Sequence, residues 1–169
     1  MKNRKRNRMM GYDYASDNLY FVTICVQNRV CCFGKVIRNE ISNETNATLF
    51  KMDLNQFGKI VEERILWLAE QYQYVILHNY VIMPNHIHAI IEIKSSLVKN
   101  TKIKSLSQLV GAFKTTSSKH VHLAGYDDFK WQRSFHDIII RNEQAFHTIS
   151  KYIDLNPEKW KKDVFNELS

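Results

Sequence analysis

The sequence has little cysteine, proline or glycine and no long apolar run, and these shortages exclude several classes of protein. Its 169 residues include three cysteines, two prolines and five glycines. Two of the cysteines, Cys31 and Cys32, are adjacent, so the set suits neither a disulfide framework nor a zinc knuckle and indicates thiols in a reducing compartment. No segment approaches the roughly 18 apolar residues that a membrane helix needs, and no secretory signal pattern is visible. We therefore expect a cytoplasmic protein that does not span a membrane.

The chain also lacks internal repeats, low-complexity blocks and linkers rich in proline and glycine, which favours one domain. Positive charge is concentrated at the start, because five of the charges behind the net charge of +7 lie in the first eight residues. Subtracting these five leaves +2 for the rest of the chain. We expect a basic arm over residues 1–10 and a single domain over residues 11–169. An arm of this kind is either a solubilising tail or a contact for nucleic-acid phosphates.

Hydrophobic periodicity predicts strands and helices in the order β, β, α, β, β, α, β, α. The expected strands cover residues 19–27, 32–37, 73–82, 86–93 and 135–140. The expected helices begin near Asp53 or Asn55, at residue 105 and at Asn142, and extend to about residues 71, 123 and 155. Pro157 should end the last helix, because proline disfavours helical geometry in the residue before it. The polar segments 38–48 and 94–104 are expected to be loops.

Hairpins interleaved with helices are typical of an α+β fold. The strands on either side of Pro84-Asn85 are separated by so short a break that they should form an antiparallel hairpin. The sequence therefore predicts an antiparallel sheet with helices packed on one face, related to the ferredoxin-like architecture. The strand over residues 86–93 is apolar at nearly every position, so we expect it in the middle of the sheet.

Two histidines on that strand are the strongest candidates for a chemical role. His86 and His88 are two residues apart, so on a strand their side chains share one face while Ile87 faces the other. This arrangement suits a metal or phosphate site, and it is also compatible with histidines that are satisfied in the core or at a sheet edge. His120 and His122 have the same spacing in a predicted helix, where residues two apart do not face each other, so they should not form a ligand pair.

Two imidazoles alone would hold a metal weakly, and the last predicted helix offers further ligands. Tyr152 and Asn156 lie four residues apart, on one face and about one turn from each other. The apolar stripe Phe146, Ile149 and Ile153 should pack on the sheet, with Tyr152 and Asn156 at its edge. Tyr152 is thus either part of a site or an amphipathic packing residue.

Several motifs occur in an order that resembles a known family. They are residues 11–14 (GYDY), 20–29 (YFVTICVQNR), 83–88 (MPNHIH), 131–135 (WQRSF), 139–143 (IIRNE) and 152–157 (YIDLNP). The sequence resembles the REP-associated tyrosine transposases, single-tyrosine HUH endonucleases related to the insertion-sequence-200-like transposases. The resemblance covers about residues 11–160, and a histidine-hydrophobe-histidine motif combined with the later Tyr-x-x-x-Asn-Pro is specific.

The resemblance implies an HUH endonuclease palm and a role for each site residue. His86 and His88 match the two metal-ligating histidines, Tyr152 matches the nucleophilic tyrosine, and Asn156 matches the polar residue that completes the metal site. Ile87 meets the requirement for a hydrophobic middle residue. Imidazole and amide ligands suit Mn²⁺ as well as Mg²⁺, so either ion is the expected cofactor.

The family resemblance also implies a DNA strand transferase acting on single-stranded DNA beside a hairpin, through a 5′-phosphotyrosine intermediate. Phosphate and base contacts are expected from basic and aromatic residues outside the centre, namely Arg4, Lys5, Arg6, Arg8, Tyr12, Tyr14, Lys114 and Arg133. Trp131 is expected to pack in the core, whereas His136 could be a site residue or a packing residue.

Two other readings remain open at this stage. The chain could be a catalytically silent module that binds hairpin DNA and derives from a transposase, although it keeps both histidines, the tyrosine and the asparagine. It could also be a metal-dependent phosphodiesterase that uses water and leaves Tyr152 structural. Either a monomer or a homodimer is compatible with the sequence.

Overall fold

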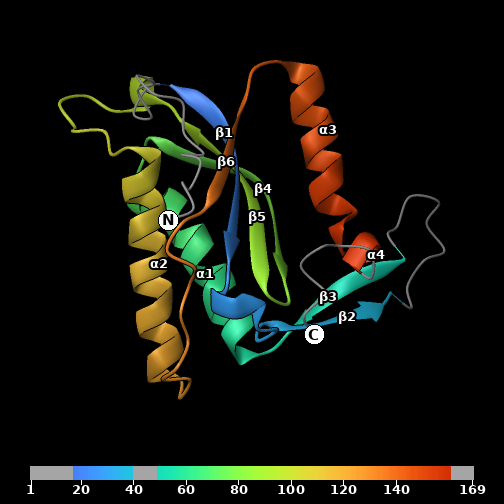
Figure 1. Ribbon diagram of the computed structural model, residues 1–169. Helices are drawn as coiled ribbons and strands as arrows, with labels where there is room; N and C mark the ends of the chain where they lie inside the picture. The colour runs from blue at the N-terminus through green and yellow to red at the C-terminus, as the bar shows by residue number, and fades with distance from the viewer. Residues whose placement is uncertain (1–16, 40–48, 161–169) are drawn as a thin grey trace, which may run out of the picture.

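A four-stranded antiparallel sheet is the centre of the computed structural model, which describes residues 17–39 and 49–160 (Figure 1). The strands are β1 (Asn18–Cys25), β4 (Val75–Met83), β5 (His86–Ile93) and β6 (His136–Ile140), in the order β4-β5-β1-β6. The strand that carries the two histidines is therefore an interior strand, as predicted. The predicted arm over residues 1–10 lies outside the described residues.

The β4–β5 hairpin places the histidines at one end of the sheet. Its strands pair from Met83 opposite His86 to Val75 opposite Ile93, and the turn consists only of Pro84 and Asn85. The antiparallel hairpin predicted from the sequence is confirmed. The pairing shifts by one residue between Leu77 and Asn79, which is a β-bulge.

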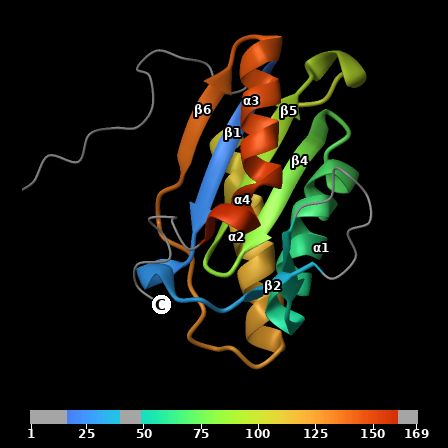
Figure 2. The same cartoon turned by 90° about the vertical axis from the view of Figure 1, so that its right-hand side faces the viewer.

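Helices cover both faces of the sheet, so the prediction that they share one face is wrong (Figures 1 and 2). On one face, α1 (Gln56–Gln71) and α2 (Leu106–Leu123) pack on a large core that contains Val22, Ile24 and Ile87. On the other face, α3 (Glu143–Asp154) packs on a small cluster around Ile90 and Ile140. The strands are apolar on both faces, and such strands need cover on both sides.

Side-chain caps set the helix starts close to the predicted positions. Asn55 accepts hydrogen bonds from the amides of Phe57 and Gly58 at the start of α1. Ser105 and Gln108 form a capping box at the start of α2, and Asn142 caps α3. After α3 the chain continues into a short helix, α4 (Asn156–Lys159), with Pro157 in its first turn.

The second predicted strand does not join the main sheet. It is β2 (Gly34–Arg38), and it pairs with β3 (Phe50–Leu54), a strand that the sequence analysis missed, to form a separate two-stranded sheet. Before β2, the amides of Cys32 and Phe33 both donate to the carbonyl of Pro84, which diverts the chain away from β1. The backbone contact between α1 and this sheet is close, because a Cβ on Gly58 would lie 2.2 Å from the Phe33 carbonyl oxygen.

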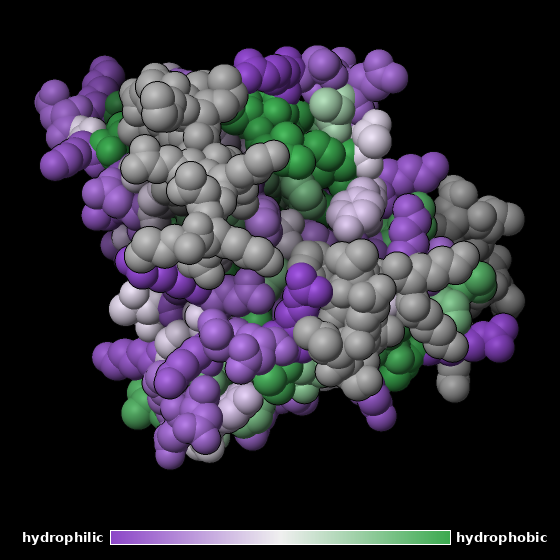
Figure 3. All heavy atoms as spheres, viewed as in Figure 1, coloured by the Kyte–Doolittle hydropathy of each residue, from purple (hydrophilic) through white to green (hydrophobic). Residues whose placement is uncertain are grey.

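Trp131 is a core residue, as predicted. Its ring contacts Phe33, Phe113 and Phe129, and its indole N–H donates to the Ser117 hydroxyl at 2.9 Å. No helix among the described residues is long and apolar enough to cross a membrane. Apolar side chains gather at the surface between the sheet and α3 (Figure 3), where a hollow of about 390 Å³ is lined in part by Leu19, Ile140 and Phe146.

Candidate metal and nucleophile site

The two strand histidines face each other beneath the C-terminal half of α3. His86 and His88 are almost completely buried, and their Nε2 atoms lie 3.1 Å apart. Ile87 between them packs into the opposite core, as the strand period requires. In contrast, His120 and His122 lie on α2, where His120 is exposed and His122 contacts the Phe129 carbonyl oxygen, so they form no ligand pair.

Hydrogen bonds on the far side of each imidazole hold the rings in this orientation. Nδ1 of His86 lies 2.7 Å from Oδ1 of Asn85, whose amide nitrogen donates to the Arg29 carbonyl. An amide oxygen only accepts, so Nδ1 of His86 carries the proton and Nε2 presents a lone pair. Nδ1 of His88 lies 2.9 Å from the Thr23 hydroxyl, which can donate or accept.

The Thr23 hydroxyl lets His88 change tautomer. When the hydroxyl donates to Nδ1, His88 keeps its proton on Nε2 and can donate it to the lone pair of His86. When the proton is on Nδ1, the hydroxyl accepts a hydrogen bond from that N–H, and both Nε2 atoms then present lone pairs toward the same point. That second arrangement is what a cation requires, and Thr23 supports it without any movement of the ring.

Both imidazoles are neutral at physiological pH. Burial lowers the pKa of His88 to about 3. Burial also lowers the pKa of His86 to about 2, with smaller contributions from the neighbouring imidazole and the Arg29 guanidinium, while the Asn156 amide opposes the shift. Neutral imidazole is the form that ligates metals, so a cation would displace no proton from the pair above about pH 4.

Asn156 supplies a third group with metal-ligand chemistry. Its side chain is fully buried, and within the described ranges neither its amide oxygen nor its amide nitrogen makes a hydrogen bond of good geometry. A buried amide without such bonds is costly, and a bound ion is one way of satisfying it. Its influence on the pKa of His86 places it beside that ring. The residues present therefore fit a divalent cation held by two imidazoles and one amide oxygen.

This donor set depends on Asn156. Across residues 17–39 and 49–160, no group of three histidine, cysteine, aspartate or glutamate side chains is positioned to hold a metal ion. The two histidines alone would leave a cation weakly bound.

Tyr152 lies on α3 beside the histidine pair, whereas Asn156 lies after the end of α3, as the first residue of α4, and not on one continuous helix with Tyr152 as predicted. Its ring centroid is 5.3 Å from that of His88 and 6.1 Å from that of Phe21, which in turn stacks on His88 at 5.2 Å. The ammonium of Lys159 lies 5.7 Å from the Tyr152 ring centroid. The structure thus brings together residues from three segments of the chain that are far apart in sequence.

Polar contacts fix α3 and α4 over the site. The amide nitrogen of Asn79, at the β4 bulge, lies 2.8 Å from the Ser150 hydroxyl and 2.9 Å from the Asp154 carboxylate. Glu158 on α4 accepts a hydrogen bond of 2.7 Å from the Leu49 amide, at the start of β3. These contacts determine where Tyr152 and Asn156 lie relative to the sheet.

The sequence analysis missed several residues that surround the centre. Thr23 and Phe21 come from β1, Lys159 and Trp160 from α4 and the residue after it, and Trp160 stacks on His86 at 6.1 Å. Asn85 was part of the recognised motif but received no role. The Thr23–His88 contact depends on the register in which β1 pairs with β5, which periodicity alone does not give.

The predicted DNA-contact residues have different outcomes. Arg4, Lys5, Arg6, Arg8, Tyr12 and Tyr14 lie outside the described residues. Arg133 is exposed and stays a candidate. The ammonium of Lys114 contacts the carbonyls of Gln132, Arg133 and Ser134 at 2.7–3.3 Å. These carbonyls accept hydrogen bonds from the ammonium, and the phosphate contact expected of Lys114 stays a prediction. His136 is exposed and pairs with Thr23 at the edge of the site.

Comparisons with known proteins bear on the family and the fold of the chain. A family model described as "Transposase IS200 like" matches residues 17–156. An uncharacterized protein of Haemophilus influenzae is 33% identical over 177 residues, which cover 95% of this chain and 91% of the relative. A solved structure of a REP-associated tyrosine transposase bound to a REP hairpin covers 90% of this chain and 73% of its own, at a TM-score of 0.57 and 18% identity, and so shares the fold.

Proposed function

The chain belongs to the IS200-like transposase family, and from this premise we propose that it cuts and rejoins single-stranded DNA beside hairpins through a 5′-phosphotyrosine intermediate. The observation that carries the proposal is the convergence of Tyr152, the buried histidine pair and the unsatisfied Asn156 amide at one point. A phosphodiester placed there would meet a nucleophile and a cation site together.

The proposed cation ligands are His86, His88 and Asn156, and the ion is Mg²⁺ or Mn²⁺. Such an ion, when bound, polarises the scissile phosphate and offsets the charge that develops on its oxygens. This help matters because a tyrosine hydroxyl has a pKa of ~10 and is a poor nucleophile at neutral pH.

Tyr152 would carry the covalent step. Its hydroxyl oxygen forms a bond to phosphorus and loses its proton, while the bond from phosphorus to the 3′ oxygen breaks and that oxygen gains a proton. The products are a 5′-phosphotyrosine and a free 3′-hydroxyl. Because the new ester replaces the old one, a second 3′-hydroxyl can reverse the step and join strands without ATP.

Neighbouring side chains would assist Tyr152. The Lys159 ammonium near its ring favours negative charge on the phenolate oxygen and on an approaching phosphate. Trp160 stacks on His86 and Phe21 stacks on His88, and both rings would limit the access of water to the imidazoles. Thr23 and Asn85 hold the Nε2 atoms toward the cation position.

Hairpin DNA is the proposed substrate. The solved neighbour with the same fold was determined as a complex with a REP hairpin, which supports a hairpin ligand here. The five positive charges within residues 1–8 suit a polyanionic partner. We further propose that the protein acts as a monomer or a homodimer.

The test is an adduct assay. The protein is incubated with a hairpin oligonucleotide that carries single-stranded flanks, in Mn²⁺ or in EDTA, and SDS-resistant protein–DNA adducts are separated on a gel. We expect an adduct with Mn²⁺ only, and its loss in Tyr152→Phe, with Tyr126→Phe as a matched control away from the site. Cleavage without an adduct would support hydrolysis by water, and binding without cleavage would support a silent DNA-binding module.

A further inference from the structure

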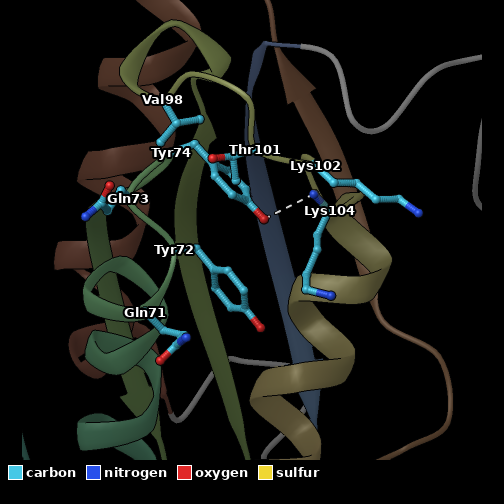
Figure 4. Close-up of a pocket in the computed structure, with 8 residues that line it drawn as sticks. All are labelled: Gln71, Tyr72, Gln73, Tyr74, Val98, Thr101, Lys102 and Lys104. Atoms are coloured by element: carbon cyan, nitrogen blue, oxygen red, sulfur yellow. Dashed lines mark hydrogen bonds between the residues drawn. The ribbon is translucent and has the colours of Figure 1, made fainter.

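A second pocket lies at the end of the sheet opposite the histidine pair. It occupies about 300 Å³ where α1 leads into β4, and Gln71, Tyr72, Gln73 and Tyr74 line it together with Lys102 and Lys104 from the segment before α2 (Figure 4). This volume is at the lower limit of the roughly 300–1,000 Å³ typical of ligand sites, so it suits one small group. The eight residues of β5 separate it from His86, which is about 23 Å at ~3.3 Å per residue.

The pocket is built on one buried residue, Tyr74. Its carbonyl accepts a hydrogen bond of 2.8 Å from the Lys94 amide, and its hydroxyl accepts one of 3.1 Å from the Lys104 amide (Figure 4). Tyr74 therefore holds both ends of the 94–104 segment, one through its backbone carbonyl and the other through its side-chain hydroxyl. The loop predicted over residues 94–104 is thus held in place against the pocket.

An aromatic side chain forms one wall of the pocket. Tyr72 is half-buried, and its ring lies 6.0 Å from that of Trp67 and 5.9 Å from that of Tyr74. The guanidinium of Arg64 lies 5.9 Å from the Trp67 ring centroid. Packing on two other rings holds Tyr72 rigidly, and the part of it that remains accessible faces a space lined with amide and ammonium groups. Such a wall suits a nucleobase, which can stack on tyrosine and hydrogen-bond to glutamine.

Positive charge surrounds this pocket. Residues 94–104 contain four lysines and no acidic residue, and Lys94, Lys99, Lys102 and Lys104 are all exposed. The nearby Asp17 carboxylate accepts a hydrogen bond of 2.7 Å from the Ser95 amide, and this bond lowers its pKa. The lysines spread well beyond the pocket itself, so they match a polyanion better than a single phosphate group.

We propose that this pocket is a second DNA contact, which stacks one unpaired nucleotide on Tyr72 and binds the adjoining phosphates through Lys102 and Lys104. The ligand is thus a single-stranded part of the same DNA that Tyr152 is proposed to cut. The proposal rests on the proposed function in taking DNA as the ligand. It adds an anchor about one sheet length from the reacting phosphate.

The experiment measures binding separately from chemistry. Fluorescence anisotropy in EDTA follows a labelled single-stranded oligothymidylate of about 15 nucleotides, a length within reported site sizes, and a duplex of equal length. We expect Tyr72→Leu to weaken single-strand binding by about fivefold or more and duplex binding by less than twofold, whereas Tyr72→Phe keeps wild-type affinity. Unchanged single-strand affinity in Tyr72→Leu would overturn the stacking role.

The lysines are tested by the salt dependence of binding. The double variant Lys102→Gln/Lys104→Gln should lower the slope of log affinity against log salt by about 1.4, because each single-strand phosphate contact contributes roughly 0.7. The matched control Lys59→Gln/Lys119→Gln removes two exposed lysines from α1 and α2 and should leave the slope unchanged. An equal loss of slope in both pairs would overturn a localised site.

These outcomes are independent of the covalent step. If the Tyr72 and lysine variants bind DNA normally while the wild-type protein forms its Tyr152 adduct, the second contact is refuted and the proposed function stands. If they bind weakly while no adduct forms under any condition, the proposed function fails and the second contact stands.

Discussion

Replacing Asn156 with leucine, which has nearly the same shape, should stabilise the metal-free protein and abolish its response to metal. In the wild-type protein the amide is fully buried, and neither of its polar atoms has a well-formed hydrogen bond to any described residue. Folding therefore removes the hydrogen bonds of the amide to water without replacing them by well-formed hydrogen bonds to the protein. A metal ligand can tolerate this, because the cation would supply the missing interaction.

The expected size of the effect follows from that burial. An unsatisfied buried polar group costs about 1–3 kcal/mol, so Asn156→Leu should gain roughly that much in EDTA. If the free energy of unfolding falls by about 2 kcal/mol for each molar of urea, the urea midpoint of unfolding should rise by about 0.5–1.5 M. Wild-type protein should gain about 2.7 kcal/mol in Mn²⁺ at 100 times its dissociation constant, and the variant should gain almost nothing.

The assay is urea unfolding followed by circular dichroism, in EDTA and in Mn²⁺. Asn85→Leu is the matched control, because Asn85 is equally buried but hydrogen-bonds to His86 and to the Arg29 carbonyl. That variant should lose stability in EDTA. The reasoning is refuted if Asn156→Leu loses stability in EDTA, or if it retains the stabilisation by Mn²⁺.

Three further predictions concern the groups around the site. Thr23→Val should weaken Mn²⁺ binding by about 10- to 100-fold in calorimetry, because it removes the hydroxyl beside Nδ1 of His88, and Thr23→Ser should restore the affinity. Normal affinity in the valine variant would exclude the role of Thr23 in setting the tautomer. In EDTA, the free energy of unfolding should fall by about 1–3 kcal/mol between pH 7.5 and 5.5. The unfolded chain takes up protons on His86 and His88 at their ordinary pKa of 6.5, whereas in the folded protein the pKa is about 2 for His86 and about 3 for His88, so both stay neutral. Urea midpoints that do not change with pH would contradict this. Asn79→Ala should slow single-turnover adduct formation by about 10- to 100-fold at unchanged DNA affinity, and an equal rate would show that α3 is positioned by packing alone.

Much of the local structure could be predicted from the sequence, since it depends on near neighbours along the chain. The sequence analysis correctly predicted the cap Asn142, Asn55 as one of two candidate caps, a helix that begins at residue 105, and the hairpin around Pro84, because each depends on a few consecutive residues. The missed strand β3 (Phe50–Leu54) is short, half-exposed and next to a polar segment, so its pattern was weak.

The sequence by itself determined that His86 and His88 share one face and that Ile87 faces the core. These relations follow from the strand period alone. Only the tertiary structure decided that α3 covers the face opposite α1 and α2, and that the Asn79 contacts and the packing on Ile90 place Tyr152 beside His88. It also decided that Lys114 holds a backbone segment and that Thr23 orients His88. These contacts join residues far apart in the chain, so they depend on strand register and helix packing, which no local pattern specifies.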